Sequence, residues 1–288
     1  MSYINLATIF LIFSACQANS ENVTSILTTS NDIVAQTPAP ISHSPGTTIL
    51  ERFNPPPGYD RQHCLTGSFG EYLRNLPLKP NESPVLFYDG SLKNSNKHAA
   101  VLDMDIGDRD LQQCADAIMR IRAEYFFKRK EYDQISYHFV NGFSADYNRW
   151  AKGERISVKG NTTKWYGNKS ADYSYQNFRD YLTMVYIYAG TASLEKELKP
   201  KPIADLSIGD VFIRGGSPGH AMLIVDVALN ETGKKVFMLA QSYMPAQSIH
   251  IVKNLENEKI SPWYELNESE MILDTPSWNF YYAELRSF

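Results

Sequence analysis

Between residues 210 and 252 the chain carries four strand-forming runs in close succession, and this segment constrains the fold most. The connections are short, with Gly-Gly-Ser-Pro-Gly between the first two runs and an Asn-to-Lys turn between the next two. Consecutive strands joined by so few residues pair antiparallel. The runs therefore predict an antiparallel β-meander made of residues 210–214, 220–229, 236–241 and 248–252.

The preceding part of the chain is predominantly helical in pattern. Asp110 and Gln113 have the spacing of a capping box, and apolar residues at helical spacing follow them. Helices before a meander indicate an α+β fold rather than an alternating α/β one. No repeat and no Gly/Ser linker divides residues 51–288, so we expect a single globular domain. The other helices are predicted at 67–76, 146–152 and 177–198, and further strands at 85–88, 99–106 and 135–140.

The amino-acid composition excludes several classes of protein. Of the 288 residues, 43% are apolar and 21% are charged, which is too apolar for a disordered protein. The 28 basic residues are outnumbered by 32 acidic ones, so the sequence predicts no nucleic-acid partner. Three cysteines are too few for a disulfide scaffold, and their odd number calls for separate roles.

The first cysteine follows a short apolar run. Residues 6–13 are too few to span a bilayer but match the core of a signal peptide, and Ser14-Ala15-Cys16 follows them. Small residues before a cysteine resemble the bacterial lipobox. We therefore expect residues 1–15 to be a signal peptide and Cys16 to be lipidated. An ordinary signal peptide and a misassigned start are the alternatives.

Residues 16–50 are rich in Ser, Thr, Asn, Pro and Ala and show no sustained periodicity. Such a composition buries too little surface to offset the entropy of ordering, so it predicts a flexible tether. A tether behind an acylated cysteine indicates a protein of the bacterial cell envelope whose membrane partner is reached through the lipid anchor.

A Gly-Asp pair opens the first meander strand and a Gly-His pair opens the second, at Gly209-Asp210 and Gly219-His220. This arrangement resembles the core of the NlpC/P60 and CHAP peptidoglycan hydrolases, which are papain-like. The resemblance implies that His220 is the general base and that Gln241, on the following strand, orients it. The chemistry agrees, since an imidazole suits proton transfer near neutral pH and an amide orients it without adding charge. The alternative is that His220 only caps a hairpin and Gln241 only faces solvent.

The nucleophile implied by the same resemblance is Cys114. It falls near the start of the predicted helix, where the helix dipole lowers a thiol pKa, and Gln112 and Gln113 are candidate oxyanion donors. A disulfide with Cys64 and a plain core thiol are the alternatives. If Cys114 is not the nucleophile, Ser242 is the other candidate.

Metal and cofactor sites have no support in the sequence. No His-x-x-x-His or Cys-x-x-Cys pair occurs, and Gly215-Gly216 lacks the lysine of a phosphate-binding loop. The acidic stretch from Asp103 fails the EF-hand pattern, since Asp108 and Cys114 stand at its sixth and twelfth positions. Two such carboxylates near a cleft could still bind a cation or a substrate amine.

Aromatic residues near polar turns carry a competing hypothesis. Exposed Trp and Tyr rings stack on sugar faces, and Trp165 and Trp263 are the candidates for substrate binding, although such rings mostly fill cores. The alternative function is accordingly a non-catalytic envelope lipoprotein module that binds glycan or peptide.

Over residues 51–288 the chain also resembles a family of uncharacterised bacterial lipoproteins, described as a domain of unknown function (4846). That family implies no activity. With the papain-like core, our leading hypothesis is an envelope thiol hydrolase that cleaves an amide bond in cell-wall peptide and needs no cofactor. The residues that carry the family resemblance are Pro55-Pro56-Pro57-Gly58-Tyr59, Ser68-Phe69-Gly70, Leu76-Pro77-Leu78-Lys79, Tyr88-Asp89-Gly90, Asp110-Leu111-Gln112-Gln113-Cys114-Ala115-Asp116-Ala117, Tyr188-Ala189-Gly190-Thr191, Pro218-Gly219-His220-Ala221 and Ala240-Gln241-Ser242-Tyr243-Met244-Pro245-Ala246-Gln247.

Overall fold

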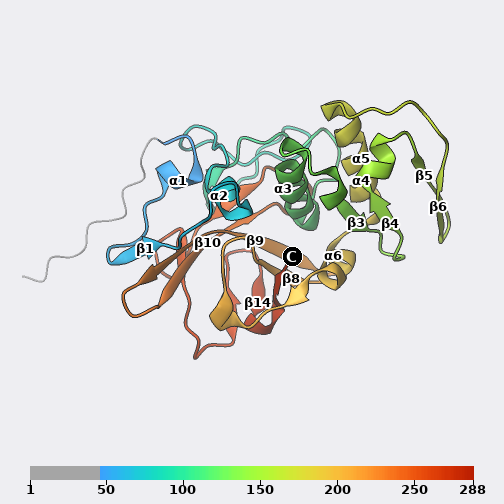
Figure 1. Ribbon diagram of the computed structural model, residues 1–288. Helices are drawn as coiled ribbons and strands as arrows, with labels where there is room; N and C mark the ends of the chain where they lie inside the picture. Colours follow the sequence, from blue (N-terminus) through green and yellow to red (C-terminus); the bar gives the residue numbers. More distant parts are fainter. Residues whose placement is uncertain (1–45) are drawn as a thin grey trace, which may run out of the picture. The chain divides into compact units, whose positions relative to one another are not determined.

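An antiparallel sheet organises the protein (Figure 1), whose computed structural model describes residues 46–288. The predicted meander forms its centre, and each of its strands pairs antiparallel with the next. These four strands are β8 (Val211–Arg214), β9 (His220–Asn230), β10 (Lys235–Gln241) and β11 (His250–Val252). Together with the helices they confirm an α+β fold with antiparallel strands.

Five short strands from distant parts of the chain extend this meander. The sheet runs in the order β2-β11-β10-β9-β8-β15-β7, while β1 pairs with β9 and β12 pairs with β10. Strands of two to four residues are too short to show an alternating pattern, which is why the sequence did not reveal most of them. The five are β1 (Tyr59–Arg61), β2 (His98–Val101), β7 (Lys199–Pro200), β12 (Trp263–Glu265) and β15 (Leu285–Ser287).

Two of the predicted strands are corrected. The predicted strand at 99–106 ends at Val101, and Leu102 continues only as an isolated bridge to Leu78. Residues 85–88 form no strand, because Leu86 and Phe87 make only isolated bridges. The remaining hairpins are β3 (Ser136–His138) with β4 (Ser144–Asp146), β5 (Arg155–Lys159) with β6 (Thr162–Tyr166), and β13 (Ile272–Asp274) with β14 (Asn279–Tyr281).

Helix α3 (Cys114–Lys128) starts three residues later than predicted, because its N-cap is Gln113 and not Asp110. Its N-cap is Gln113, whose backbone N–H donates to Asp116 Oδ2 over 3.0 Å. Asp110 does not cap the helix. Instead its Oδ1 accepts hydrogen bonds from Gln113 Nε2 at 3.0 Å and from the backbone N–H of Ala246 at 2.7 Å. The consequence is that Cys114 is the first residue of the helix rather than the last residue of its first turn.

The long helix predicted over 177–198 is two helices, α5 (Tyr175–Tyr188) and α6 (Thr191–Glu197). Ala189 and Gly190 adopt extended backbone conformations between them, and this ends the helical hydrogen bonding. The remaining helices are α1 (Ile49–Arg52), α2 (Phe69–Arg74) and α4 (Tyr147–Ala151), with 3-10 turns at Tyr132–Gln134, Ile203–Asp205 and Tyr282–Glu284.

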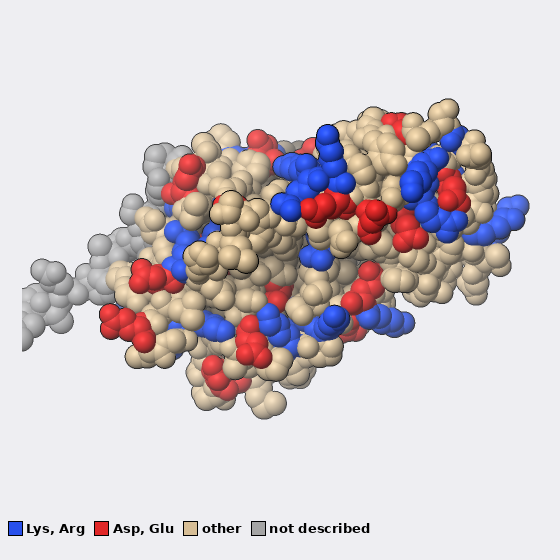
Figure 2. Space-filling view, viewed as in Figure 1, with Lys and Arg blue, Asp and Glu red and all other residues tan. Residues whose placement is uncertain are grey.

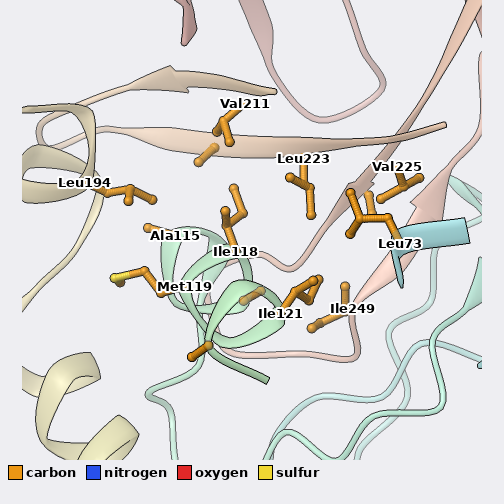
Figure 3. Packing of buried hydrophobic residues seen from close by; sticks show 14 of the residues in the cluster. Leu73, Ala115, Ile118, Met119, Ile121, Leu194, Val211, Leu223, Val225 and Ile249 are labelled. Atoms are coloured by element: carbon orange, nitrogen blue, oxygen red, sulfur yellow. The ribbon is translucent and has the colours of Figure 1, made fainter. Parts of the chain in front are cut away.

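The sheet buries apolar side chains on both faces. On one face, Ala115 and Ile118 of α3 pack against Val211 and Leu223 (Figure 3). The opposite face holds a second cluster, in which the alternate residues of β8 and β9 contact β14 and neighbouring segments. Burial on both faces accounts for the nearly continuous apolar run of β9, because neither set of alternating side chains meets solvent.

The folded part begins with α1, whose first residue Ile49 is fully buried and lies two positions before the boundary we expected at residue 51. The signal peptide, Cys16 and most of the expected tether lie outside the described residues. Within residues 46–288 no helix is both long and apolar enough to cross a membrane. On the face shown in Figure 2, basic and acidic side chains are interspersed.

Candidate active site

Cys114 lies at the N-terminus of α3, where the first backbone N–H groups of a helix have no intrahelical partner. Its side chain is buried, with 7% of the residue exposed. The backbone N–H groups of Ala115 and Ala221 lie close enough to lower the pKa of the thiol. Burial and the charge of Asp116 outweigh them and raise that pKa to about 11. At neutral pH the thiol is therefore protonated.

His220 is the first residue of β9, and Gly219 fixes the path of the chain into it. A Cβ atom on Gly219 would lie 2.6 Å from Thr191 Oγ1, 2.7 Å from the Gly216 carbonyl oxygen and 2.8 Å from that of Arg214. Only glycine allows this approach between the loop and the start of α6. The Gly-His pair of the sequence motif is thus explained by packing as well as by the position of the imidazole.

The imidazole of His220 belongs to a buried chain of three side chains. His220 Nε2 lies 2.8 Å from Gln241 Oε1, and Gln241 Nε2 lies 3.2 Å from His250 Nε2. His250 Nδ1 lies 2.9 Å from the carbonyl oxygen of Ser248. A carbonyl only accepts, so His250 carries its proton on Nδ1 and accepts from the amide of Gln241. The amide oxygen then accepts from Nε2 of His220, which leaves Nδ1 of His220 as the unprotonated, basic nitrogen.

Burial also sets the charge of this chain. It lowers the pKa of His220 to about 4, although the bond to Gln241 acts in the opposite direction. Burial likewise lowers the pKa of His250 to about 3. Both rings are neutral at physiological pH, and the same burial makes His220 a weaker proton acceptor than a free imidazole. The rings of Tyr243, Trp278 and Phe280 surround it with centroids at 4.8, 5.6 and 6.0 Å.

The side chains of Cys114 and His220 start from neighbouring positions in the fold but lie on opposite faces of the sheet. Ala221 belongs to the cluster beside α3, whereas the His220 ring lies against Phe280 in the cluster on the opposite face. Within the described residues no hydrogen bond joins the thiol to the imidazole. The structure therefore brings the cysteine to the start of the strand that carries the histidine, with the two groups unpaired.

The two candidate oxyanion donors are placed differently. Gln113 lines the pocket beside Cys114, and its amide donates to Asp110. Gln112 is buried, and its Oε1 accepts from Arg120 Nη1 at 2.8 Å, which turns the side chain away from the thiol pocket. Gln113 is thus the one of the two side chains that shares a pocket with the cysteine.

The proposed sugar-stacking role of Trp263 is wrong. Its ring is fully buried, and its Nε1 donates to the carbonyl oxygen of Asn54 at 2.9 Å, so no ligand can stack on it. Trp165 lies on β6, half-buried. The Arg149 guanidinium lies 4.5 Å from its ring centroid and Phe143 packs at 5.7 Å. Nothing in the described structure connects Trp165 with Cys114.

Several other candidates have structural roles. Cys64 and Cys114 are both free thiols, so they form no disulfide with each other. Ser242 is fully buried and donates to the carbonyl oxygens of Gln247 and Gln112. Asp210 accepts from Lys201 Nζ at 2.7 Å and from the backbone N–H of Ser207. Among residues 46–288 no group of three or more His, Cys, Asp and Glu side chains is placed to hold a metal ion.

Three polar residues of the site were missed by sequence reasoning. His250 had no spaced partner in the sequence, but the β10–β11 register pairs it with Gln241, so aligning the two predicted strands would have found it. Asp116 and Tyr186 line the pocket beside Cys114. They come from different helices, and no sequence spacing signals their proximity.

The fold and the site define a class, namely an α+β protein with a helix N-terminal cysteine beside a buried His-Gln-His chain. The chain belongs to the family described as Domain of unknown function (4846), whose model matches residues 49–287. No curated protein and no solved structure matches the chain.

Proposed function

We propose that the protein is a papain-like thiol hydrolase that cleaves an amide bond, with Cys114 as nucleophile, His220 as general base and Gln241 as the orienting residue. One observation carries this proposal. The hydrogen-bond chain from His250 through Gln241 leaves Nδ1 of His220 basic, on the strand whose second residue contacts the Cys114 thiol.

The reaction would proceed in two steps. His220 Nδ1 takes the thiol proton while the sulfur attacks the carbonyl carbon, and the C–N bond then breaks as the imidazolium returns that proton to the leaving amine. Water, deprotonated by His220, hydrolyses the resulting thioester to a carboxylic acid and the free thiol. The backbone N–H groups at the start of α3 are the donors available to the oxyanion.

The resting geometry defines what substrate binding must accomplish. The thiol and the imidazole are both neutral and unpaired, and the His220 ring lies against Phe280 on the opposite face of the sheet. The proposed proton transfer therefore requires the His220 side chain to leave these contacts and reach the sulfur in the substrate complex. The segment Gly216–Gly219 leads directly into His220 and lines the cysteine pocket, so it is the segment through which a bound substrate would act on the ring.

The substrate class follows from the expected location. The lipobox-like N-terminus and the predicted tether favour an envelope location for the domain, and the abundant amide polymer of that compartment is cell-wall peptide. We therefore propose peptidoglycan peptides as the substrate, with the membrane reached through acylated Cys16.

The test uses the full chain with purified peptidoglycan and with soluble peptides released from it. Cys114→Ala should lower amide hydrolysis by about 10³-fold or more, as loss of a nucleophile does. Intact-mass spectrometry of the native protein should show a thioester adduct that Cys114→Ala lacks. Cys64→Ala is the matched control and should retain activity, because Cys64 lies outside the pocket. Undiminished hydrolysis by Cys114→Ala would refute the nucleophile.

A second function is favoured by the unpaired thiol and imidazole, namely a non-catalytic envelope module that binds glycan or peptide in the same pocket. It predicts saturable binding of wall fragments by native protein and by Cys114→Ala alike, with no turnover and no adduct in either. The same preparations therefore decide between the two functions.

A further inference from the structure

The β5–β6 hairpin lies outside the main sheet and forms a two-stranded sheet of its own (Figure 1). Because side chains alternate along a strand, the hairpin has two faces of different character. Its inner face, with Ile156, Val158 and Trp165, packs against the hydrophobic core. The register places the remaining side chains on the outer face, which consists of Arg155, Ser157, Lys159, Thr162, Lys164 and Tyr166.

The segment that contains the hairpin is basic, in contrast to the chain as a whole. Residues 151–170 hold five basic residues and one acidic residue, a net charge of +4, whereas the whole chain has a net charge of -4. The acidic residue, Glu154, accepts two hydrogen bonds from the Arg149 guanidinium, at 2.9 and 2.6 Å. Arg155 donates to the carbonyl oxygens of Trp150 and Glu154 at 2.9 and 2.7 Å. The charges that remain available to a partner are therefore those of the lysines.

Four lysines of this segment have no counter-charge on the protein. Lys159 and Lys164 are exposed on the outer face of the hairpin. Lys152 and Lys169 are exposed at its base, where the backbone N–H of Lys169 donates to the carbonyl oxygen of Gly153 at 3.0 Å. None of the four side chains forms an ion pair within the part of the chain that the structure describes. The hairpin thus presents a set of ammonium groups to solvent.

The two outer-face lysines lie close enough to contact one polymer chain. Lys164 pairs with Ser157 in the register, and Lys159 pairs with Thr162. The lysines are therefore diagonal neighbours, about 7–8 Å apart. Each of them has a hydroxyl group directly across the strand pair, and the ring of Tyr166, 53% exposed, lies on the same face. Ammonium and hydroxyl groups donate to carboxylates, and a phenol ring can stack on a sugar.

The composition of the outer face favours one class of partner. None of its side chains is aliphatic, so the face has nothing to insert into a bilayer. A single aromatic ring is too few to stack a run of nucleic-acid bases. Spaced ammonium groups with hydroxyls and one ring instead suit a sugar polymer that bears carboxylates. In the envelope location proposed above, peptidoglycan has this chemistry, because its peptides carry free carboxylates.

We propose that the β5–β6 hairpin docks the protein on peptidoglycan, the carboxylate-bearing polymer that carries its substrate. This inference rests on the proposed function, which supplies the cell wall as the partner. The surface is nevertheless separate from the reaction site, since no residue of β5 or β6 lines the Cys114 pocket. Docking through the hairpin raises the effective concentration of wall peptide at that pocket without any contact with the reacting atoms.

The test measures binding of the full chain to purified, insoluble peptidoglycan by co-sedimentation. Cys16→Ala and Cys114→Ala are present throughout, so that neither a lipid anchor nor hydrolysis affects the result. The comparison probe is peptidoglycan whose carboxylates have been converted chemically to amides. We expect about 10-fold tighter binding to native than to amidated peptidoglycan, and the difference should shrink when NaCl is raised from about 0.05 to 0.5 M, because salt screens exposed charges.

The variants separate the hairpin from the charge of the whole protein. Lys159→Gln combined with Lys164→Gln should raise the Kd for native peptidoglycan about 5- to 10-fold and leave the weaker binding to amidated peptidoglycan unchanged. Lys199→Gln combined with Lys259→Gln is the matched control, because it removes the same charge from exposed positions outside the hairpin. Its Kd should stay within about twofold of the parent value. Thermal melts check that each variant is folded.

Equal binding to native and amidated peptidoglycan, or equal losses in the hairpin and control variants, would overturn the docking surface. Tighter binding to phosphatidylglycerol vesicles than to peptidoglycan would also overturn it and assign the hairpin to a membrane surface. Failure of the hydrolase gives a different result. Lysine-dependent binding by a protein that hydrolyses nothing retains the docking surface and refutes the hydrolase. With Cys114 intact, hydrolysis of insoluble peptidoglycan at the same rate with and without the two hairpin lysines refutes the docking surface while the nucleophile stands.

Discussion

Strand β9 carries two buried polar clusters, one around Asp226 and one around His220. The two clusters differ in how many of their polar atoms have hydrogen-bond partners. Asp226 is fully buried, and its carboxylate accepts from Arg61 Nε and Arg74 Nε at 2.7 Å each, and from the backbone N–H of Val227. At the other end, His220 has a bonded Nε2, but its Nδ1 has no hydrogen bond within the described residues.

This difference in hydrogen bonding indicates that the Asp226 cluster has a structural role and that the His220 end has a functional one. The Asp226 cluster joins α2 and β1 to the sheet, and every charge in it has a counter-charge at hydrogen-bond distance. Near the start of the same strand, the pocket of the Cys114 thiol is lined by Asp116 and Tyr186, each of which has one polar atom without a hydrogen-bond partner in the described structure. Satisfied buried groups stabilise one conformation, whereas each unsatisfied buried group has a cost and calls for an explanation of its own.

Asp226→Asn breaks the satisfied cluster and should have the largest effect on stability. It leaves two arginines of low exposure without a counter-charge, which costs about 3–5 kcal/mol of unfolding free energy. Urea denaturation of the full chain at pH 7 measures it. Asp116→Asn is the comparison, since the amide oxygen still accepts from Gln113 and no ion pair is lost. Similar losses in the two variants would contradict the distinction.

His220 should make the protein acid-sensitive in a defined window. Its folded pKa is about 4 against an ordinary value of 6.5, so between these values the unfolded chain binds a proton that the folded state excludes. Stability from this group is complete above pH 6.5 and is lost as the pH falls to about 4, by roughly 3 kcal/mol. Lys93 contributes to the shift in the same direction as burial.

Unfolding free energies of native protein and of His220→Gln, measured between pH 7 and 4, check this. The variant should lose less stability over the window, although part of the loss remains because His250 has a lowered pKa as well. His63→Gln, at an exposed position, should follow the native profile. Parallel profiles for His220→Gln and native protein would mean that the ring is not held neutral.

These clusters also show where sequence reasoning was sufficient. Strands β8 to β11 were predictable because each has several apolar residues and a clear turn signal, such as the Asn230 turn. The Gly219-His220 pair and Gln241 were found through the same segment. Cys114 was correctly assigned to the start of a helix, although the Asp110 capping pattern placed that start three residues early.

What the sequence could not supply were contacts between distant segments. Asp226 meets Arg61 and Arg74 across 165 and 152 positions, and no local pattern announces such a pairing. Asp116 and Tyr186 come together only when α3 and α5 pack. Trp263 was misplaced because composition cannot distinguish a buried ring from an exposed one. Long-range packing decides all three cases.

His250 offers the smallest and most specific test of the unsatisfied end. Its Nε2 accepts from the Gln241 amide, so it acts as a positioning residue for His220. His250→Leu removes that acceptor, so the side-chain amide of Gln241 can flip and exchange the positions of its oxygen and nitrogen. This should lower kcat about 10-fold, which corresponds to about 1.4 kcal/mol, with KM nearly unchanged. His250→Gln restores an acceptor and should recover most of the rate.

The matched control is His98→Leu, whose ring packs 6.2 Å from that of His250 but stands outside the chain of side-chain hydrogen bonds. It should leave kcat unchanged. Equal losses of kcat in His250→Leu and His250→Gln would show that His250 only fills space, because a residue that acts through packing alone would not need a hydrogen-bond acceptor. Recovery in His250→Gln alone ties the rate to the orientation of the Gln241 amide, and through it to the basic nitrogen of His220.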